Sequence, residues 1–216
     1  MGITGENIRN IAVIGHSGEG KTTLCEAMLF NGGATDRQGK VLDGTTVTDY
    51  LPEEIKRQVT ISASLAPIEW QNTKLNMIDT PGYADFIGEV VSTTRAVDNM
   101  LMVICGVAGI EVQTEVIWDI AANQKLPRII FINKLERENS CFETVVEQLR
   151  EKYGTGIVPL QLPMGKEASF SGMIDLLNEK AYRFEAGKAI EIPIPEEYME
   201  DYEAQRTYLI EVAAES

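Results

Sequence analysis

Residues 10–24 read Asn-Ile-Ala-Val-Ile-Gly-His-Ser-Gly-Glu-Gly-Lys-Thr-Thr-Leu, and this stretch decides the fold. A short apolar run at 11–14 meets a glycine-rich turn, and the segment 22–30 that follows favours a helix. All fixed positions of the phosphate-binding P-loop pattern G-x-x-x-x-G-K-[ST] are filled, by Gly15, Gly20, Lys21 and Thr22. The sequence therefore predicts a strand, a phosphate cradle and a helix in direct succession.

The predicted cradle wraps phosphates in backbone N–H groups, with the positive end of the following helix behind them. Lys21 would contact the β- and γ-phosphates, and the Thr22 hydroxyl would bind Mg²⁺. Both roles require a triphosphate-like ligand. The residues expected to line the cradle are Gly15, His16, Ser17, Gly18, Glu19, Gly20, Lys21, Thr22 and Thr23.

A second motif, Asp79-Thr80-Pro81-Gly82, follows an apolar run at 75–78. Asp79 would stand at the carboxyl end of a strand, where open α/β sheets bind ligands, and its carboxylate can hold Mg²⁺ directly or through water. Gly82 leaves a bare N–H that can face a γ-phosphate. By itself, the pattern D-x-x-G fits an ordinary strand-to-loop turn better than a nucleotide site. Because it follows a P-loop here, it supports the P-loop as a second motif of the same site.

A third motif, Asn133-Lys134-Leu135-Glu136, follows the apolar run 128–132. In the GTPase pattern N-K-x-D, the Asn orients the base, the Lys stem covers its flat face, and the acid accepts two hydrogen bonds from guanine. Glu136 stands where Asp is usual and is one methylene longer. We read the motif as guanine selection by Asn133, Lys134 and Glu136, with a helix-capping acid as the alternative for Glu136.

The first 135 residues alternate between strand-like and helix-like segments. Apolar runs of the kind found in doubly covered strands lie at 11–14, 75–78, 100–105 and 128–132. Helical spacing of apolar residues marks 86–97 and 112–123 as crossover helices. This alternation predicts a mostly parallel sheet. The segment 32–60 is rich in Gly, Thr and charge, and it predicts a long mobile loop.

After residue 136 the composition becomes more acidic. The pattern predicts helices at 138–152 and 193–215, with short strands at 157–162, 170–177 and 181–184. The acidic charge fits a solvated helix face as well as a partner-binding face.

Charge and composition exclude several functions. With 33 Asp and Glu against 19 Lys and Arg, the net charge of −14 argues against a direct grip on nucleic acid. His16 is the only histidine, and Cys25, Cys105 and Cys141 lack C-x-x-C spacing, so a zinc cluster is not expected. No secretory signal or long apolar run is present, so we expect a cytoplasmic protein without membrane contact. The oligomeric state is left open.

The order of the three motifs identifies a GTPase, and the residues between them resemble translational GTPases. The chain is similar to elongation factor G, and most of all to its elongation factor G-like paralogues. The resemblance covers essentially all 216 residues and rests on the stretches 15–24, 57–61, 79–86, 107–114 and 158–165.

This resemblance implies a Ras-like P-loop NTPase fold, an α/β three-layer sandwich with a mostly parallel sheet. The GTPase core would span 1–155, and 156–216 would be part of an α+β insertion, the G′ subdomain, which faces the ribosomal stalk protein. The segment 32–60 would be switch I, in which Thr60 joins Mg²⁺ beside a γ-phosphate, and switch II would begin at Asp79. The resemblance also implies hydrolysis of GTP to GDP and phosphate, stimulated by the ribosome through the full-length factor.

The family pattern has a fifth guanine-binding loop, S-A-[KL], on its last core strand. No such triplet follows Glu136, and the chain stops at Ser216. We therefore expect a fragment of a larger factor, without the last core strand and helix.

Four positions depart from the family pattern. Tyr83 replaces a histidine that orients the attacking water, and a neutral phenol cannot offer an imidazolium to the developing charge. Ser17 replaces an apolar gate residue, and Gly18 replaces an aspartate near the phosphates. The residues at positions 83, 17 and 18 together predict slow intrinsic hydrolysis. Glu136, the fourth departure, predicts looser guanine selectivity. His16 matches the family, and we expect it to support the packing of the loop.

The residues expected to carry the reaction are Tyr83, Lys21, Thr60 and Gly82, with Thr22, Thr60 and Asp79 as the metal ligands. Two other interpretations stay open. One is a GTP-sensing switch that binds the ribosome and hydrolyses little by itself. The other is a generic P-loop ATPase, which competition between GTP and ATP would test.

Overall fold

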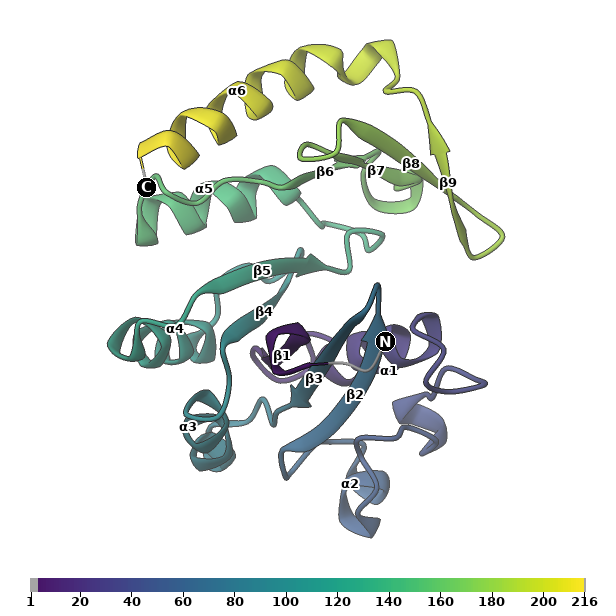
Figure 1. Ribbon diagram of the computed structural model, residues 1–216, viewed down its shortest axis with the longest axis vertical. Coiled ribbons are helices and arrows are strands. Elements are labelled where there is room, and N and C mark those ends of the chain that lie inside the picture. The colour runs from purple at the N-terminus through teal and green to yellow at the C-terminus, as the bar shows by residue number, and fades with distance from the viewer. Residues whose placement is uncertain (1–3, 216) are drawn as a thin grey trace. The chain divides into compact units, whose positions relative to one another are not determined.

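The computed structural model describes residues 4–215, which divide into two compact units (Figure 1). The first unit consists of residues 4–104 and 111–133, and the second of residues 105–110 and 134–215. Residues 1–3 and 216, the outermost residues of the two predicted domains, lie outside the described residues.

A five-stranded sheet forms the centre of the first unit. Its strands, in the order β2-β3-β1-β4-β5, are β1 (Ile8–Ile14), β2 (Ser64–Trp70), β3 (Thr73–Asp79), β4 (Asn99–Cys105) and β5 (Arg128–Asn133). Strand β1 runs parallel to both of its neighbours, β3 and β4, whereas β2 pairs with β3 in the antiparallel sense. These pairings confirm the predicted mostly parallel sheet. The sheet could be predicted because long apolar runs mark strands that are covered on both faces.

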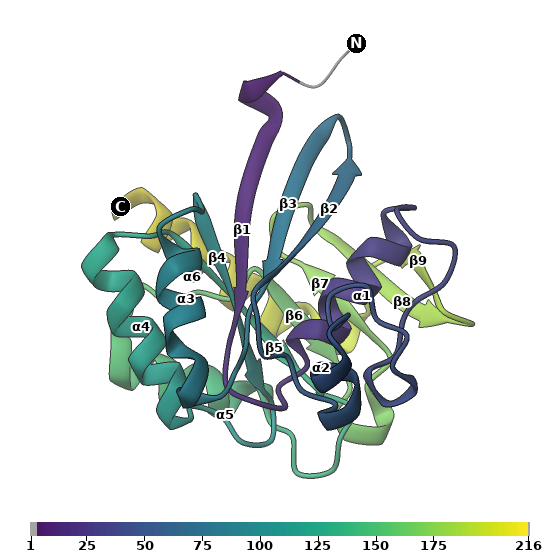
Figure 2. The ribbon, with the colours of Figure 1, turned by 90° about the horizontal axis from the view of Figure 1, so that it is seen from below.

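Helices cover both faces of this sheet. The helices of the first unit are α1 (Lys21–Asn31), α2 (Pro52–Arg57), α3 (Ile87–Thr94) and α4 (Val112–Gln124), with short 3₁₀ turns η1 (Gly5–Asn7), η2 (Val41–Asp43) and η3 (Ala84–Phe86). Figure 2 shows α1 on one side of the strands and α3 and α4 on the other. Beneath α1, a buried cluster joins the helix to the sheet: Val13, Cys25, Leu29, Ala66, Ile68, Met77 and Val103. The predicted α/β three-layer fold is therefore confirmed.

Two features of the first unit differ from the sequence-based expectation. Strand β2 was not predicted, because Pro67 lies within it and proline is rare inside strands away from a sheet edge. It is an edge strand, where a missing backbone N–H is tolerated. The segment 32–60 is also not a plain loop, since it contains η2 and α2, and Pro52 begins α2 at a position that suits proline.

The second unit is an antiparallel sheet with two helices. Its strands, in sequential order across the sheet, are β6 (Gln161–Met164), β7 (Gly172–Asp175), β8 (Lys180–Glu185) and β9 (Lys188–Ile192). Helices α5 (Phe142–Tyr153) and α6 (Met199–Glu215) accompany them, with 3₁₀ turns η4 (Glu167–Ser169) and η5 (Glu196–Tyr198). Side chains of β6, β7 and β8 share a buried cluster with Tyr202 and Leu209 of α6.

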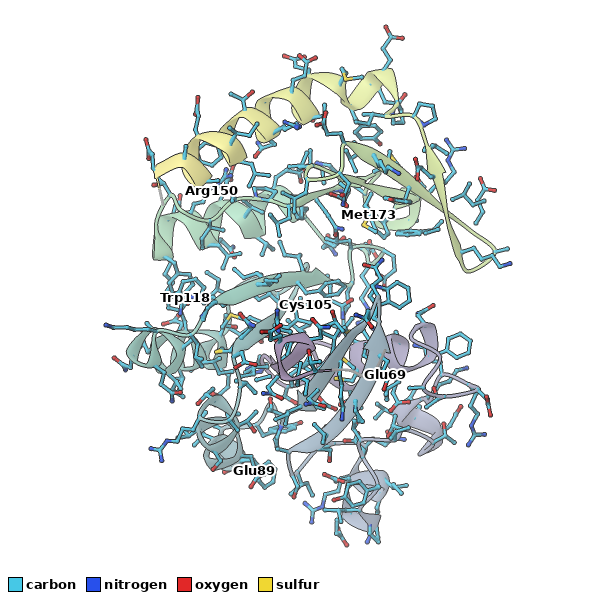
Figure 3. All side chains as sticks on the ribbon, in the orientation of Figure 1. Glu69, Glu89, Cys105, Trp118, Arg150 and Met173 are labelled. Carbon is cyan, nitrogen blue, oxygen red and sulfur yellow. The ribbon has the colours of Figure 1, made fainter. Side chains whose placement is uncertain are left out.

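Helix α6 begins later than the predicted position 193. Pro193 and Pro195 disfavour helical conformation in the residues before them, so the helix starts only after η5. Helix α6 is joined to α5 by Arg150, labelled in Figure 3, whose guanidinium lies 4.8 Å from the ring centroid of Tyr208. Strand β9 was not predicted, because its side chains are almost all exposed and show no alternation.

Candidate functional site

The P-loop connects the end of β1 to the start of α1. Gly20 has a φ of 102° and caps α1, and its carbonyl accepts the first helical hydrogen bond from Leu24 at 2.9 Å. A side chain at this position would meet the Asn133 amide nitrogen, since a Cβ would lie 2.5 Å from it. Glycine is therefore required at position 20 both by backbone conformation and by space.

The ammonium group of Lys21 is folded back onto its own loop. Its side chain is 5% exposed, and Nζ donates a 2.7 Å hydrogen bond to the carbonyl oxygen of His16. Burial lowers the pKa of Lys21, while the nearby carboxylates of Asp79 and Glu19 act in the opposite direction. The loop thus carries a buried lysine that is surrounded by acids.

Thr22 and Thr60 bring the P-loop and the 32–60 segment together. Their hydroxyl oxygens lie 3.0 Å apart, and both residues are buried. They are 38 residues apart in the chain, so the contact depends on how the 32–60 segment folds. Two hydroxyl oxygens that converge in this way can share one hard cation.

Asp79 lies at the carboxyl end of β3, opposite Val13 of β1, and it is fully buried. Its Oδ2 accepts a 2.9 Å hydrogen bond from the Thr48 hydroxyl, whereas its Oδ1 has no hydrogen-bond partner. Burial raises the pKa of Asp79 to about 6, against the effects of the Thr22 and Thr48 hydroxyls. A buried carboxylate oxygen without a donor is suited to a cation.

Gly82 lies against the backbone of the P-loop. A Cβ at this position would lie 2.7 Å from the amide nitrogen of Ser17 and 2.8 Å from the carbonyl carbon of His16. Only a residue without a side chain allows this approach. The D-T-P-G turn and the phosphate cradle are thus in direct contact.

Asn133 joins the end of β5 to the P-loop. Its side-chain amide donates a 2.7 Å hydrogen bond to the carbonyl oxygen of Glu19, across 114 residues of sequence. Glu19 itself is 1% exposed, so its side chain points into the protein. The third motif therefore reaches the first through its asparagine.

Several other predicted site residues are exposed or belong to the second unit. Tyr83 is 45% exposed, and Thr23 is exposed on α1. Lys134 and Glu136 belong to the second unit, and Glu136 is exposed. His16 lies 3.5 Å from Glu111, measured from Nε2 to Oε1, at the start of α4. The roles assigned to these residues stay predictions.

Thr48 and Asp49 lie near the site and were missed from the sequence. Thr48 binds Asp79, and Asp49 is 3% exposed. Burial raises the pKa of Asp49, while the Thr60 hydroxyl acts in the opposite direction. The sequence evidence for these two residues was the polar composition of the 32–60 segment. That composition does not show which of its polar side chains become buried.

The site also suits a magnesium ion. Residues 4–215 contain no group of three or more His, Cys, Asp or Glu side chains that could hold a metal. Mg²⁺, however, takes a few protein oxygens and completes its shell with water and phosphate. The hydroxyls of Thr22 and Thr60 and the unpartnered Oδ1 of Asp79 fit that donor set.

The fold and the cradle define this unit as a P-loop nucleotide-binding domain. The profile of the elongation factor Tu GTP binding domain matches residues 6–214. The chain therefore belongs to the elongation factor Tu GTP-binding domain family, and the predicted similarity to translational GTPases is confirmed.

The relatives point to the elongation factor G branch of these proteins. Elongation factor G of Mycoplasma pneumoniae is 39% identical over 211 residues, and that of Mycoplasma genitalium is 38% identical over 212 residues. The alignments cover 96% and 97% of this chain and 31% of each relative. A crystal structure of a Thermus thermophilus protein matches with a TM-score of 0.91 and 37% identity, over 96% of this chain and 31% of that one.

The chain thus spans 31% of the length of these relatives. Among residues 4–215, we find no helix with the length and hydrophobicity needed to cross a membrane.

Proposed function

We propose that this chain is the guanine-nucleotide-binding domain of an elongation factor G-like translation factor, and that it hydrolyses GTP to GDP and phosphate. The observation that carries the proposal is the 3.0 Å contact between the hydroxyls of Thr22 and Thr60 beside the buried Asp79. This contact links the P-loop, the 32–60 segment and the end of β3 at one point. Such a point can distinguish a triphosphate from a diphosphate.

Phosphate binding would use the P-loop backbone and Lys21. To reach a phosphate, the Lys21 ammonium would exchange its bond with the His16 carbonyl for one with a β- or γ-phosphate oxygen. Thr22, Thr60 and Asp79 would hold Mg²⁺, which supplies positive charge to the phosphate oxygens when bound.

Hydrolysis would depend on positioning and charge stabilisation of an in-line attack by water. The N–H of Gly82 would face the γ-phosphate, and Tyr83 would hydrogen-bond the attacking water. Tyr83 is 45% exposed, so its phenol is accessible to water. We infer that ribosome binding promotes this step, so the isolated chain hydrolyses GTP slowly.

Base selection is assigned to Asn133, Lys134 and Glu136. Asn133 already binds the P-loop backbone, which supports its part in this task. Glu136 is longer than the usual aspartate, so we infer a looser preference for guanine.

An alternative is a GTP-sensing switch that binds the ribosome with little hydrolysis of its own. Tyr83 favours it, since a neutral phenol cannot offer an imidazolium to the developing charge. Ser17 and Gly18 point in the same direction, because both depart from the family pattern inside the loop.

We further propose a GTPase core at 1–155 and a G′ insertion at 156–216, which would meet the ribosomal stalk protein. The factor would belong to the elongation factor G-like paralogues and act in the cytoplasm. Contact with the ribosome would pass through the full-length factor, because the net charge of −14 does not suit a direct grip on RNA.

Single-turnover hydrolysis by the full-length factor, with and without ribosomes, tests the proposal. We expect the ribosome to raise the rate of GTP hydrolysis, and we expect GTP to displace a bound guanine nucleotide better than ATP does. A factor that binds GTP but shows no ribosome-stimulated hydrolysis would be the switch instead. Equal competition by ATP would contradict guanine selection.

A further inference from the structure

Buried or half-buried glutamates from three helices hold residues 32–63, called here the 32–63 segment. Glu26 of α1 is fully buried and accepts hydrogen bonds from the amides of Gly39 at 3.1 Å and Val47 at 2.6 Å. Glu89 of α3, labelled in Figure 3, accepts one from the amide of Ala63 at 2.8 Å. The third glutamate, Glu54, lies within the segment, on α2.

Glu54 uses both carboxylate oxygens and is fully buried. Its Oε2 accepts a 3.0 Å hydrogen bond from the amide of Leu51, at the start of α2. Its Oε1 accepts bonds from the amides of Ile61 at 3.0 Å and Ser62 at 3.1 Å. A buried carboxylate is costly unless it is hydrogen-bonded, so this set of three donors stabilises one arrangement of the segment.

The Ile61 amide belongs to the peptide group that joins Thr60 to Ile61. Because a peptide group is planar and rigid, fixing its N–H fixes the backbone on the carboxyl side of Thr60. The bond to Glu54, six positions before Thr60, therefore restrains the position of the Thr60 Cα, from which the side chain projects. Its hydroxyl points at the Thr22 hydroxyl, 3.0 Å away.

We propose that Glu54 is a positioning residue that orients Thr60 toward the nucleotide site and so sets the preference of the site for a triphosphate over a diphosphate. This inference rests on the proposed function, and it adds a residue that has no direct access to the ligand. Glu54 would act only through the backbone that it holds, because both of its oxygens are already bonded to amides.

The test is Glu54→Gln in the full chain. Glutamine keeps the shape but replaces one acceptor oxygen with an NH₂ donor, which would face backbone N–H groups. With Mg²⁺ present, we expect the affinity for a non-hydrolysable GTP analogue to fall about tenfold, while that for GDP changes less than about twofold. Amide hydrogen exchange at Ile61 and Ser62 should become at least about tenfold faster.

Glu53→Gln is the matched control. Glu53 lies next to Glu54 on α2, but it is exposed and pairs with Arg57 at 3.2 Å on the surface. We expect this variant to keep both affinities and both exchange rates. If Glu54→Gln does not fold, Glu54→Asp keeps the charge but shortens the reach, and the same loss of triphosphate preference should follow.

Equal losses for GDP and the GTP analogue in a folded variant would overturn the inference, and so would unchanged affinities. Failure of the wild-type chain to bind either nucleotide would overturn the proposed function instead. Exchange at Ile61 and Ser62 would then still report whether Glu54 holds these amides.

Discussion

The hydroxyl of Thr48 donates a 2.9 Å hydrogen bond to the carboxylate of Asp79, across 31 residues. This bond fastens the middle of the 32–63 segment to the end of β3. It uses one oxygen of a carboxylate that is completely removed from solvent, and the other oxygen has no donor. Asp79 is therefore expensive to ionise when no cation is present.

Asp79 should make the ligand-free protein less stable as the pH rises. Its pKa is about 6 in the folded chain against 3.8 for an ordinary aspartate. The stability that protonated Asp79 contributes is therefore complete below about pH 3 and is lost as the pH rises through 6. Relative to Asp79→Asn, the wild type should lose about 2 kcal/mol between pH 4 and 7, measured by urea unfolding.

The exposed Asp85 supplies the control for that experiment, as Asp85→Asn. This variant should follow the pH dependence of the wild type. If Asp79→Asn and the wild type also show parallel curves, burial does not perturb Asp79.

Lys21→Ala should weaken binding of a GTP analogue at least about a hundredfold, because it removes the buried cation that would face the phosphates in the proposed site. Titration calorimetry with Mg²⁺ measures the loss. Lys188→Ala, an exposed lysine at the start of β9, should bind like the wild type. Retained binding in Lys21→Ala would show that backbone amides suffice.

Gly82→Ala should weaken nucleotide binding about tenfold or more, since its Cβ would lie 2.7 Å from the Ser17 amide nitrogen and would displace the loop. Gly88→Ala is the matched change on α3, where a Cβ meets nothing within 4 Å. That variant should keep its affinity and gain about 0.5–1 kcal/mol of stability, measured by urea unfolding. Equal affinities in the two variants would contradict the contact.

Tyr83→His in the full-length factor should raise ribosome-stimulated hydrolysis about tenfold or more if the phenol limits the reaction. Single-turnover GTP hydrolysis measures it, with Tyr83→Phe to show what the hydroxyl contributes. An unchanged or lower rate in the histidine variant would mean that the site is adapted to the tyrosine.

The parts of the candidate site that could be predicted are those marked by a short, continuous sequence pattern. The P-loop needs glycines at fixed positions, and Asp79 and Asn133 each follow an apolar run that had to be a strand. In the structure, Asn133 and Gly82 both lie against the P-loop, while their roles toward a nucleotide stay predictions.

The parts that could not be predicted depend on distant contacts. Thr48, Asp49 and Glu54 are polar residues in a polar segment, and nothing in their local pattern shows that each becomes buried. Charged side chains are almost never fully buried without partners, and the partners of Glu54 are backbone amides, which carry no sequence signal. Strand β2 was hidden for a related reason, since Pro67 is acceptable only at a sheet edge.

The bond between Lys21 and the His16 carbonyl has a consequence for the thermodynamics of binding. If Lys21 binds phosphate as proposed, an arriving phosphate meets an ammonium that already donates one of its three N–H groups to its own loop. A phosphate that needs this N–H group would compete with the His16 carbonyl oxygen for it, so a weak anion would gain little from the exchange. In the proposed site, a ligand that also engages the loop amides and the threonine hydroxyls would gain more than it disrupts, so the bond at rest would favour such a ligand over simple anions.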